Sequence, residues 1–337
     1  MEGAPKTSNP EKESHLGSKI VEEISSIQRG RDLSALNVQE LKAVKEKYIR
    51  LKQELGVGSK KTSEGIETSY EQAQEIMGES FYGVEEIKNT FRFEFPQEKV
   101  PAIPYSPEVL EKAKENGEML VLRVESDGEG SPMTMERMNG LMQTILEEDR
   151  EEESADAEDL ADRQEKLLYD TDWYQEEDFF KNASLRTEWK LVGKNFVPDS
   201  TSKNYIEQTK ILRDYLLGLD SISKEEREEC TDELLNGLQK KLLEDWDKNW
   251  KEVARELSEL LINKNHRRIP AEILYDWVLH FRSRKERGIL EKNWDWSNTL
   301  SSGGGLVNLG SAGRGGVSVN DYAADYRDDD LGVVSLR

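Results

Sequence analysis

The chain has 337 residues and a formal net charge of −22, because 69 acidic residues outnumber 47 basic ones. A charge of this sign repels nucleic-acid backbones and anionic lipid surfaces, so we expect neither as a partner. The single cysteine, Cys230, excludes an internal disulfide, and no run of about eighteen apolar residues is present to span a bilayer. The sequence therefore predicts a soluble cytoplasmic protein.

Residues 1–95 are expected to form a helical, partly disordered N-terminal region. Apolar residues recur there at helical spacing in two stripes. The stripes are Leu16, Ile20, Ile24 and Ile27, and then Val38, Leu41, Val44, Tyr48 and Leu51. They predict either a helical hairpin that packs within the protein or helices that bind a partner helix. The second possibility would allow an oligomer.

Residues 96–146 have the pattern of a small helix–strand–helix unit. Ser106 followed by Pro107 is typical of a helix start, and Gly117 lies where that helix would end. The apolar run EMLVLRVE then predicts a strand. The helix after it has a methionine-rich stripe, which is consistent with core packing or with a binding groove. An acidic linker is expected over residues 147–166.

Within residues 167–337, strand and helix signals follow in a definite order. A strand is expected over residues 189–196, then an amphipathic helix, then a helical insertion at about 223–265. Pro270 begins another helix, and short strands separated by glycine lead to the C-terminus. Strands at the two ends of this region can pair side by side while the helices pack on the sheets, which is an α+β arrangement.

Residues 297–337, which we call the tail, use a different set of amino acids. The tail contains no Glu, Lys, Gln, Met or Trp, although the preceding part is rich in Glu, Lys and Leu. It consists mainly of Gly, Ser, Asn, Asp, Ala, Tyr, Arg and small aliphatic residues. Together with residues 293–296, its short apolar or alternating segments predict three or four short strands.

The run WDWSNTLSSGGGLVNLGSAGRGGVSVNDYAADYRDDDLGVVSLR resembles the C-terminal end of C-type-lectin-fold proteins. It is most similar to the variable proteins of diversity-generating retroelements and to the related formylglycine-generating-enzyme-like domains. The shared pattern is a Trp followed by Ser or Thr, a Leu-Val strand with Gly, a second short strand, a polar loop and a closing LGV strand. The matching positions are Trp296, Ser297, Leu306, Val307, Gly310, Val317, Val319, Leu331, Gly332 and Val333.

The resemblance covers roughly residues 100–337. Its upstream part rests on LYDTDWYQEEDFFKN, EWKLVGKNFVPDSTSKNYIEQT and PAEILYDWVLHF, which resemble bacterial proteins of unknown function with the same tail. It implies a C-type-lectin-like domain over residues 167–337 and a non-enzymatic protein that binds another protein or a surface ligand. In such families a reverse transcriptase copies a template with errors at adenines, and the product replaces part of the coding sequence.

The amino acids of the tail fit this origin. An Asn codon that ends in a pyrimidine, mutated at its two adenines, can become Asp, Tyr, Ser, Gly, Ala, Arg, Val or Leu. It cannot become Glu, Lys, Gln, Met or Trp, which are the five residues absent from the tail. Turns between short strands favour Gly, Ser and Asp, so a β region with many turns can lack Lys and Met without any mutagenesis. An ordinary turn-rich composition is therefore the alternative explanation.

If the tail varies, its apolar positions form a fixed scaffold and the residues between them vary at solvent-facing positions. The scaffold positions are Leu306, Val307, Val317, Val319, Leu331, Gly332 and Val333. The expected ligand-binding residues are Asn308, Ser311, Ala312, Arg314, Ser318, Asn320, Asp321, Tyr322, Ala323, Asp325, Tyr326, Arg327 and Asp328. Tyrosine gives a large contact area at low entropy cost, so Tyr322 and Tyr326 are the expected anchors, with core packing as the alternative.

No catalytic residue, cofactor or metal site is expected. Formylglycine generation needs a reactive cysteine pair, and the chain has one cysteine, which lies outside the tail. His15, His266 and His280 have no metal-ligand spacing. Asp328–Asp330 are expected to form a solvated acidic turn rather than a calcium site, because the sugar-and-calcium tripeptides of lectins are absent. The alternative function is a structural or scaffold protein that assembles through its helices and has an invariant tail.

Overall fold

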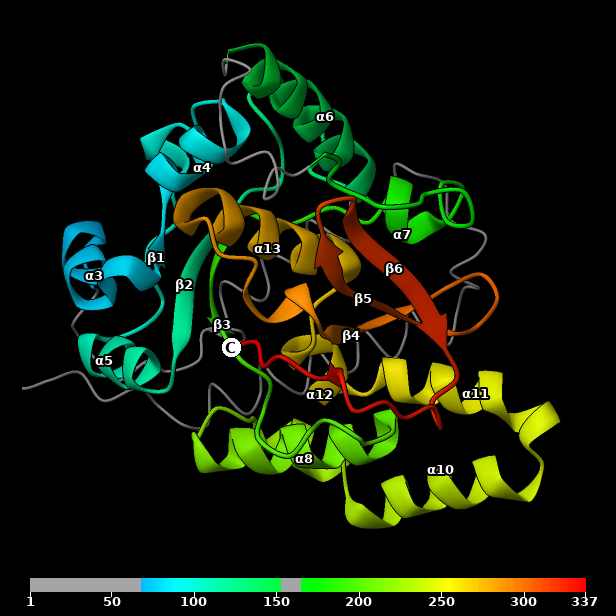
Figure 1. Ribbon diagram of the computed structural model, residues 1–337. Helices are drawn as coiled ribbons and strands as arrows, with labels where there is room; N and C mark the ends of the chain where they lie inside the picture. The colour runs from blue at the N-terminus through cyan, green and yellow to red at the C-terminus, as the bar shows by residue number, and fades with distance from the viewer. Residues whose placement is uncertain (1–67, 153–164) are drawn as a thin grey trace, which may run out of the picture. The chain divides into compact units, whose positions relative to one another are not determined.

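A computed structural model of the protein describes residues 68–152 and 165–337. These residues belong to the compact unit Ile66–Arg337, which combines helices with two β-sheets (Figure 1). The expected α+β class is therefore confirmed. The two expected N-terminal helical stripes and most of the expected acidic linker lie outside the described residues. Within the described ranges, no helix is both long enough and apolar enough to cross a membrane.

The first sheet has three strands in the order β1-β2-β3. They are β1 (Phe81–Tyr82), β2 (Glu118–Arg123) and β3 (Glu188–Gly193). Strand β1 runs parallel to β2, whereas β2 and β3 are antiparallel. All six residues of β2 are buried, as expected for a central strand. Strand β2 lies in the unit expected over residues 96–146 and β3 in the domain expected over 167–337, so this sheet joins the two regions.

Five α-helices precede β3 in the described part of the chain. They are α3 (Tyr70–Met77), α4 (Val84–Phe91), α5 (Pro107–Glu115), α6 (Met135–Glu152) and α7 (Asp178–Lys181). The Ser69 side chain caps α3 by accepting a hydrogen bond from the backbone N–H of Gln72, and Pro107 occupies the first turn of α5. The methionine stripe of α6 packs in the hydrophobic core.

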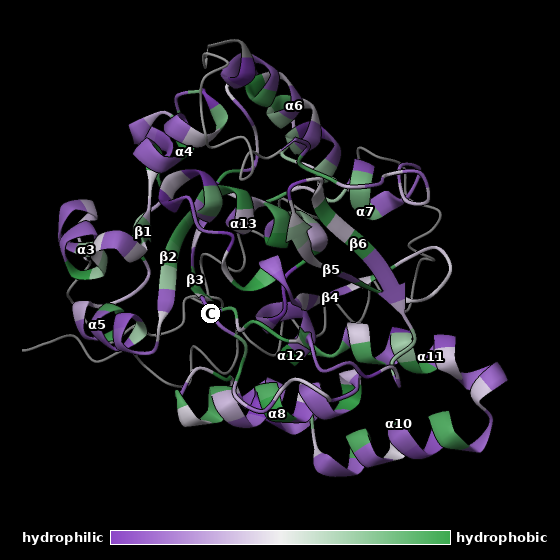
Figure 2. Cartoon of the chain, viewed as in Figure 1, coloured by the Kyte–Doolittle hydropathy of each residue, from purple (hydrophilic) through white to green (hydrophobic). Residues whose placement is uncertain are grey.

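A second group of helices lies between β3 and α13. It comprises α8 (Tyr205–Gly218), α9 (Lys224–Glu229), α10 (Asp232–Glu244), α11 (Trp246–Glu259) and α12 (Leu261–His266). Asn204 and Glu207 form a reciprocal capping box at the start of α8. The insertion expected at 223–265 is helical and contains four helices, α9 to α12. Alternating hydrophilic and hydrophobic bands along α10 mark it as amphipathic (Figure 2).

Helix α13 (Pro270–Arg284) lies between the two sheets (Figure 1). Pro270 is in its first turn, and every residue from Ile273 to Leu279 is buried. Burial on all sides of the helix fits a position between two layers rather than on a surface. The Tyr275 hydroxyl donates a hydrogen bond to the carbonyl oxygen of Leu122 on β2 at 3.0 Å, which joins α13 to the first sheet.

The second sheet has four strands in the order β6-β5-β4-β7. They are β4 (Trp294–Leu300), β5 (Leu306–Gly313), β6 (Gly316–Tyr322) and β7 (Leu331–Gly332). Neighbours are antiparallel except for β4 and β7, which run parallel. One face of this sheet contributes to the core around α13, and the other packs against a second apolar cluster with α8, α10 and α11.

Residues after β7 return to the first sheet and pair with β3. Val192 and Leu336 form an antiparallel bridge. The backbone N–H of Leu191 donates to the Arg337 carbonyl at 3.1 Å, and the N–H of Arg337 donates back to Leu191 at 2.9 Å. The Val197 N–H also donates to the Val333 carbonyl at 2.8 Å. The expected side-by-side pairing of the region's first strand with its C-terminal segment is therefore present.

Candidate functional site

The tail divides into buried strand residues and accessible residues between them. Every expected scaffold position, from Leu306 to Val333, is buried. Asn308 and Ala312, which the sequence placed among the solvent-facing ligand contacts, are also 0% exposed, so that expectation is wrong for both. The reason is that β5 lies between β4 and β6 and is covered on both faces, which its polar residues did not signal.

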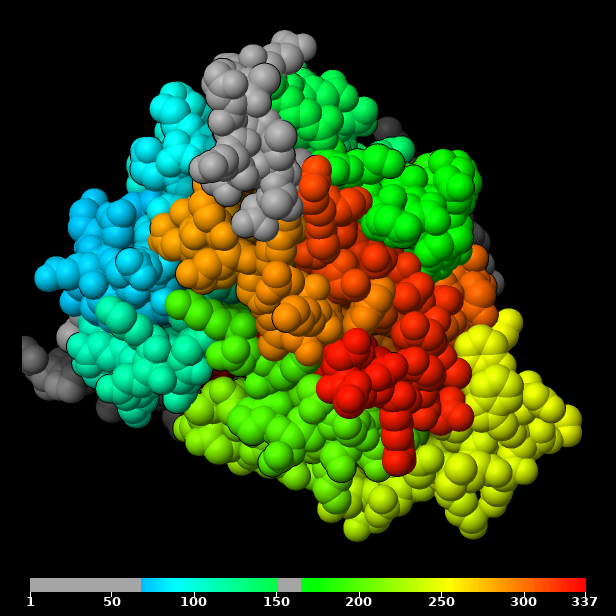
Figure 3. Space-filling model, viewed as in Figure 1, coloured from blue at the N-terminus to red at the C-terminus, as the bar shows by residue number. Residues whose placement is uncertain are grey.

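One accessible part of the tail begins on β6 and continues into the loop that follows. On β6, Val317 and Val319 are buried while Ser318 and Asn320 are partly exposed, as the two-residue period of a strand requires. The tail surface is defined here as Ser318, Asn320, Tyr322, Ala323, Asp325, Tyr326, Arg327 and Asp328. Part of the tail, drawn in red, is visible on the face shown in Figure 3, next to α8, whose Glu207 pairs with Arg327.

Two stacked tyrosines form the centre of the tail surface. The Tyr322 and Tyr326 rings lie 3.9 Å apart between centroids, with 14° between their planes. Tyr326 is 37% exposed, and its hydroxyl donates a hydrogen bond to Asp328 Oδ2 at 2.9 Å. That bond raises the pKa of Tyr326 to about 12 and lowers the pKa of Asp328. Tyr326 is therefore a protonated hydrogen-bond donor at neutral pH.

Other expected ligand contacts already have structural partners. Asp321 Oδ2 accepts a hydrogen bond from the Ser301 hydroxyl at 2.5 Å. A Cβ on Gly305 would lie 2.5 Å from the same oxygen, so Asp321 and a glycine at 305 fix the β4–β5 loop together. Arg327 forms an ion pair with Glu207 of α8 at 3.0 Å. Asp321 thus supports the loop, whereas Arg327 lies at the edge of the tail surface.

Ser311 and Arg314 are exposed but lie apart from the tyrosine pair. They occupy the end of β5 and the turn before β6, and Arg314 pairs with Glu165 at 2.9 Å. Strand β6 separates this turn from Tyr322 by roughly 20 Å, since a strand rises about 3.3 Å per residue. The structure therefore does not bring these two residues into the same surface as the tyrosines.

The carboxylates of Asp328, Asp329 and Asp330 approach one another, with one oxygen of each within 4.8 Å of the others. Burial raises the pKa of Asp330, and the charges of Asp328 and Asp329 raise it further. The Asp328 oxygens already accept hydrogen bonds from Tyr326 and from the backbone N–H of Asp329. Neighbouring acids of this kind are consistent with the expected acidic turn.

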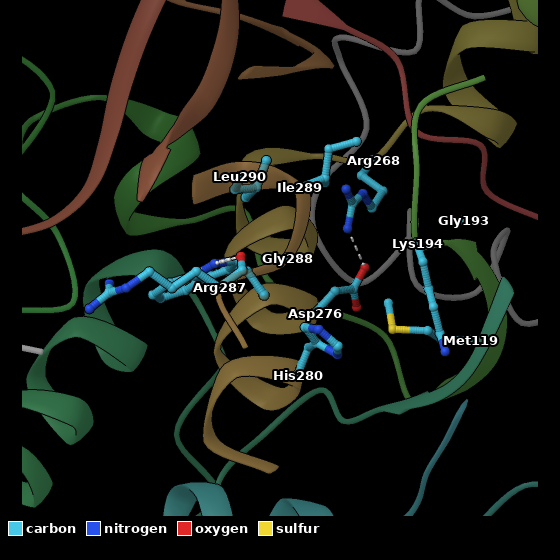
Figure 4. Close-up of a pocket in the computed structure, with 11 residues that line it drawn as sticks. Met119, Gly193, Lys194, Arg268, Asp276, His280, Arg287, Gly288, Ile289 and Leu290 are labelled. Carbon is cyan, nitrogen blue, oxygen red and sulfur yellow. Dashed lines mark hydrogen bonds and ion pairs between the residues drawn. The ribbon is translucent and has the colours of Figure 1, made fainter. Parts of the chain in front are cut away.

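A second candidate site, which the sequence did not suggest, is a cavity of about 40 Å³ (Figure 4). It lies between the end of β3, helix α13 and the turn after that helix. Met119, Lys194, Arg268, Asp276, His280 and Leu290 are among its lining residues. They come from segments far apart in the chain, so no local motif marks the cavity. Basic residues cluster in the sequence at 267–268 and again at 282–287, but neither cluster marks a cavity by itself.

Beside the cavity lies a buried charge cluster formed by Arg123, Arg268, Glu272, Asp276 and Asp295. Asp276 accepts hydrogen bonds from Arg123 Nη2 at 2.7 Å and from Arg268 Nη1 at 2.9 Å. Arg268 Nη2 reaches Asp295 at 2.8 Å, and Arg123 Nη1 reaches Glu272 at 2.7 Å. Burial raises the pKa of Asp295, although the charge of Arg268 opposes the rise. The cluster joins β2, α13 and β4.

His280 lies one helical turn after Asp276 and lines the same cavity. Its Nδ1 is 2.7 Å from the Tyr82 hydroxyl, and its Nε2 is 3.8 Å from Glu286. Burial lowers the pKa of His280; the charge of Glu286 opposes this, and the charges of Lys194 and Arg284 reinforce it. The imidazole is therefore neutral near pH 7.

Comparisons with protein-family models, with curated proteins and with solved structures find no match to this chain.

Proposed function

We propose that the protein is a non-enzymatic binding protein with a C-type-lectin-like domain over residues 167–337. Its tail surface contacts a protein ligand, and retroelement mutagenesis at adenines varies that surface while the strands beneath it stay fixed. We infer this function from the resemblance of the tail sequence to the variable proteins of diversity-generating retroelements.

The observation that carries the proposal is the division of the tail into two sets of residues. The matching apolar positions, such as Val317 and Leu331, are buried in the two apolar clusters. The residues between them on the tail surface are small, polar or tyrosine, and most are partly exposed. Changes at such exposed positions usually alter stability by less than about 0.5 kcal/mol, so the surface can vary without loss of the fold.

The tyrosine pair gives the tail surface the character of a binding surface. Exposed tyrosine supplies a large apolar contact with a hydroxyl at its end, and it loses little conformational entropy on binding. Stacking against Tyr322 and the hydrogen bond to Asp328 hold Tyr326 in place before any ligand arrives. Preorganisation of this kind reduces the entropic cost of association.

The topology also supports the proposed domain. Strand β3 pairs with the segment around Leu336, and α8 and α13 lie between these two elements in the chain. A domain closed by its first strand and its C-terminal segment is what the resemblance implies.

The genetic part of the proposal is tested in the genome around the gene. We expect a near-copy of the 3′ coding end that differs from it only where the copy has adenine, together with a reverse transcriptase gene. A complete genome without such a copy would contradict diversification, whereas the binding role would still stand.

The binding part is tested with a library in which the tail-surface codons become NNY, where N is any base and Y a pyrimidine. We expect most members to fold, and selection against a purified test protein to yield binders. In those binders, Tyr→Ala changes at 322 or 326, where tyrosine is retained, should weaken binding. Tyr169→Ala is the matched control, because Tyr169 is 63% exposed and lies outside the tail surface. Binders that lose nothing from any change in the tail surface would remove it as the binding site.

A further inference from the structure

Asparagine followed by glycine occurs three times in the chain, and the three pairs lie in different structural settings. Asn139–Gly140 lies inside α6 and Asn236–Gly237 lies inside α10, whereas Asn116–Gly117 follows the last residue of α5. In such pairs the backbone nitrogen of glycine can attack the side-chain amide of asparagine, because glycine has no Cβ to hinder the approach. The backbone around each pair therefore decides whether this reaction occurs in the folded protein.

Asn116 is the residue at which α5 ends. It is exposed, and its backbone N–H donates to the carbonyl oxygen of Lys112 at 2.9 Å. Gly117 then turns the chain out of the helix with a φ of +73°, a conformation that glycine adopts at little cost. A Cβ at Gly117 would meet no atom beyond its chain neighbours within 4 Å. The surroundings thus leave room for this pair to rearrange.

Attack requires the peptide group that joins the two residues to rotate until the glycine nitrogen faces the asparagine Cγ. One backbone hydrogen bond holds this group at Asn116, from the Gly117 N–H to the Lys114 carbonyl at 3.0 Å. No described residue donates a hydrogen bond to the carbonyl oxygen of Asn116. Inside a helix the same peptide group donates one bond and accepts another. Rotation therefore breaks one hydrogen bond at Asn116 but two in the other pairs, where it also interrupts a helix.

We propose that Asn116 is a site of spontaneous deamidation in the folded protein, and that α6 and α10 protect the other two pairs. The Gly117 nitrogen loses its proton to hydroxide and forms a bond with the Asn116 Cγ. The side-chain nitrogen takes up a proton from water and leaves as ammonia. Water then opens the resulting five-membered succinimide at either carbonyl, which leaves aspartate or isoaspartate at position 116. This assignment does not depend on the proposed function.

The position of Asn116 gives the modification a structural effect. Glu118, the first residue of β2, is 1% exposed and accepts a hydrogen bond from Arg337 Nε at 2.9 Å. The Gly117 carbonyl accepts one from the backbone N–H of Lys194 at 3.0 Å. Isoaspartate adds one carbon to the main chain directly before these contacts, and the new carboxylate lies at the negative end of the α5 dipole. We therefore expect isoaspartate to weaken the junction of α5 and β2.

Mass spectrometry of tryptic peptides measures the three pairs separately in the full chain. Cleavage after lysine and arginine places them in the peptides 115–123, 138–150 and 228–240. The folded protein is incubated at pH 8 in water enriched in ¹⁸O and digested in ordinary water, so only conversion during the incubation carries the label. Conversion in 115–123 should be about tenfold faster than in the other two peptides, because each helix must open one further hydrogen bond. Equal rates in the three peptides, or no conversion at Asn116, would overturn the proposal.

Two controls separate the effect of the fold from that of neighbouring residues. In concentrated urea the helices are lost, so the three peptides should convert at similar rates. An unchanged tenfold lead of 115–123 in urea would contradict protection by the helices. Asn116→Gln should abolish conversion in 115–123, because glutamine has to close a larger ring, while the matched variant Asn139→Gln should leave it unaltered.

The structural effect is measured on the converted protein itself. Ion exchange separates it from the unconverted chain, because deamidation adds one negative charge. Its isoaspartate form should melt at a lower temperature than the unconverted chain. Identical melting temperatures would contradict the expected effect on the junction of α5 and β2.

Discussion

The buried charge cluster and the tail surface are both polar, but they are built in opposite ways. In the cluster, Asp276 is 2% exposed and receives hydrogen bonds from arginines on two different segments. On the tail surface, Tyr326 is 37% exposed and its hydrogen bond stays within its own loop, to Asp328. A residue whose partners lie on distant segments is fixed by the whole fold, whereas one with local partners can change with its loop.

This contrast separates polar residues that hold the molecule together from those available for contact with other molecules. It also gives an order of expected effects. The change in unfolding free energy should be largest at buried ion pairs, smaller and of opposite sign at a buried amide, and smallest at the exposed tyrosine stack.

The largest effect is expected for Asp276→Asn. This change leaves Arg123 and Arg268 buried without their shared carboxylate, which typically costs about 3–5 kcal/mol of unfolding free energy. Urea denaturation followed by circular dichroism measures it. Asp329→Asn on the exposed acidic turn is the control and should change stability by less than about 0.5 kcal/mol. A loss of less than about 1 kcal/mol in Asp276→Asn would mean that the buried charge cluster does not stabilise the fold more than the exposed polar residues do.

A second buried pair should give a pH-dependent effect. Burial would raise the pKa of Glu226, but hydrogen bonds from His266, Asn265 and Ser223 outweigh it and lower the pKa from 4.5 to about 2. Because the folded-state pKa is lowered, the contribution is present above pH 4.5 and is lost as the pH falls through about 2. The difference corresponds to about 3 kcal/mol.

Urea denaturation of Glu226→Gln at a series of pH values tests this contribution. The stability of the variant should fall less steeply between pH 4.5 and 2 than that of the unaltered chain. Glu228→Gln, on the exposed side of the same helix, should keep the original slope. Parallel curves for Glu226→Gln and the unaltered chain would show that the pair does not contribute.

A smaller effect of opposite sign is expected at Asn308. Both polar atoms of its amide are buried without a hydrogen-bond partner among the described residues. An unpaired buried amide costs about 1–3 kcal/mol, so Asn308→Leu should raise the unfolding free energy by about 1–2 kcal/mol. Asn320→Leu, at the cross-strand position opposite it, is partly exposed and should change stability little. A loss of stability at 308 would mean that the amide is satisfied in solution.

The smallest effect is expected at the tyrosine stack. A double-mutant cycle with Tyr322→Ala and Tyr326→Ala should give a coupling energy of about 0.5–1.5 kcal/mol, the usual range for an aromatic pair. Thermal or urea denaturation of the two single variants and the double variant measures it. Zero coupling would mean that the rings are independent, and the tail surface would then be less preorganised than the structure indicates.

Local signals in the sequence predicted the positions of many elements. Pro107 and Pro270 mark the starts of α5 and α13, and the apolar run EMLVLRVE contains β2. Such signals depend on the residues of the segment itself, so they can be recognised in the sequence without knowledge of the rest of the fold. The pairing of β3 with the C-terminal segment also followed from the order of the elements.

What the sequence did not show depends on contacts between distant segments. Asn308 follows the alternation of a half-exposed strand, yet β5 is covered on both faces, and only the arrangement of other elements decides that. The helical insertion kept a continuous apolar spacing although Asp245 and Leu260 interrupt it. The cavity is lined by residues of β2, β3 and α13, which are far apart in the sequence, so no sequence motif identifies it.

The return of residues 333–337 to β3 makes the completed fold depend on the residues that follow the rest of the tail. These residues follow the rest of the tail in the chain, so a stop codon or a frameshift anywhere in the tail removes or replaces them. The hydrogen bonds to Leu191 and Val197 and the buried side chains of Val333 and Leu336 would then be lost. Proteases degrade such incompletely folded products. A tail that is not read in frame through residues 333–337 would therefore lack the segment that pairs with β3.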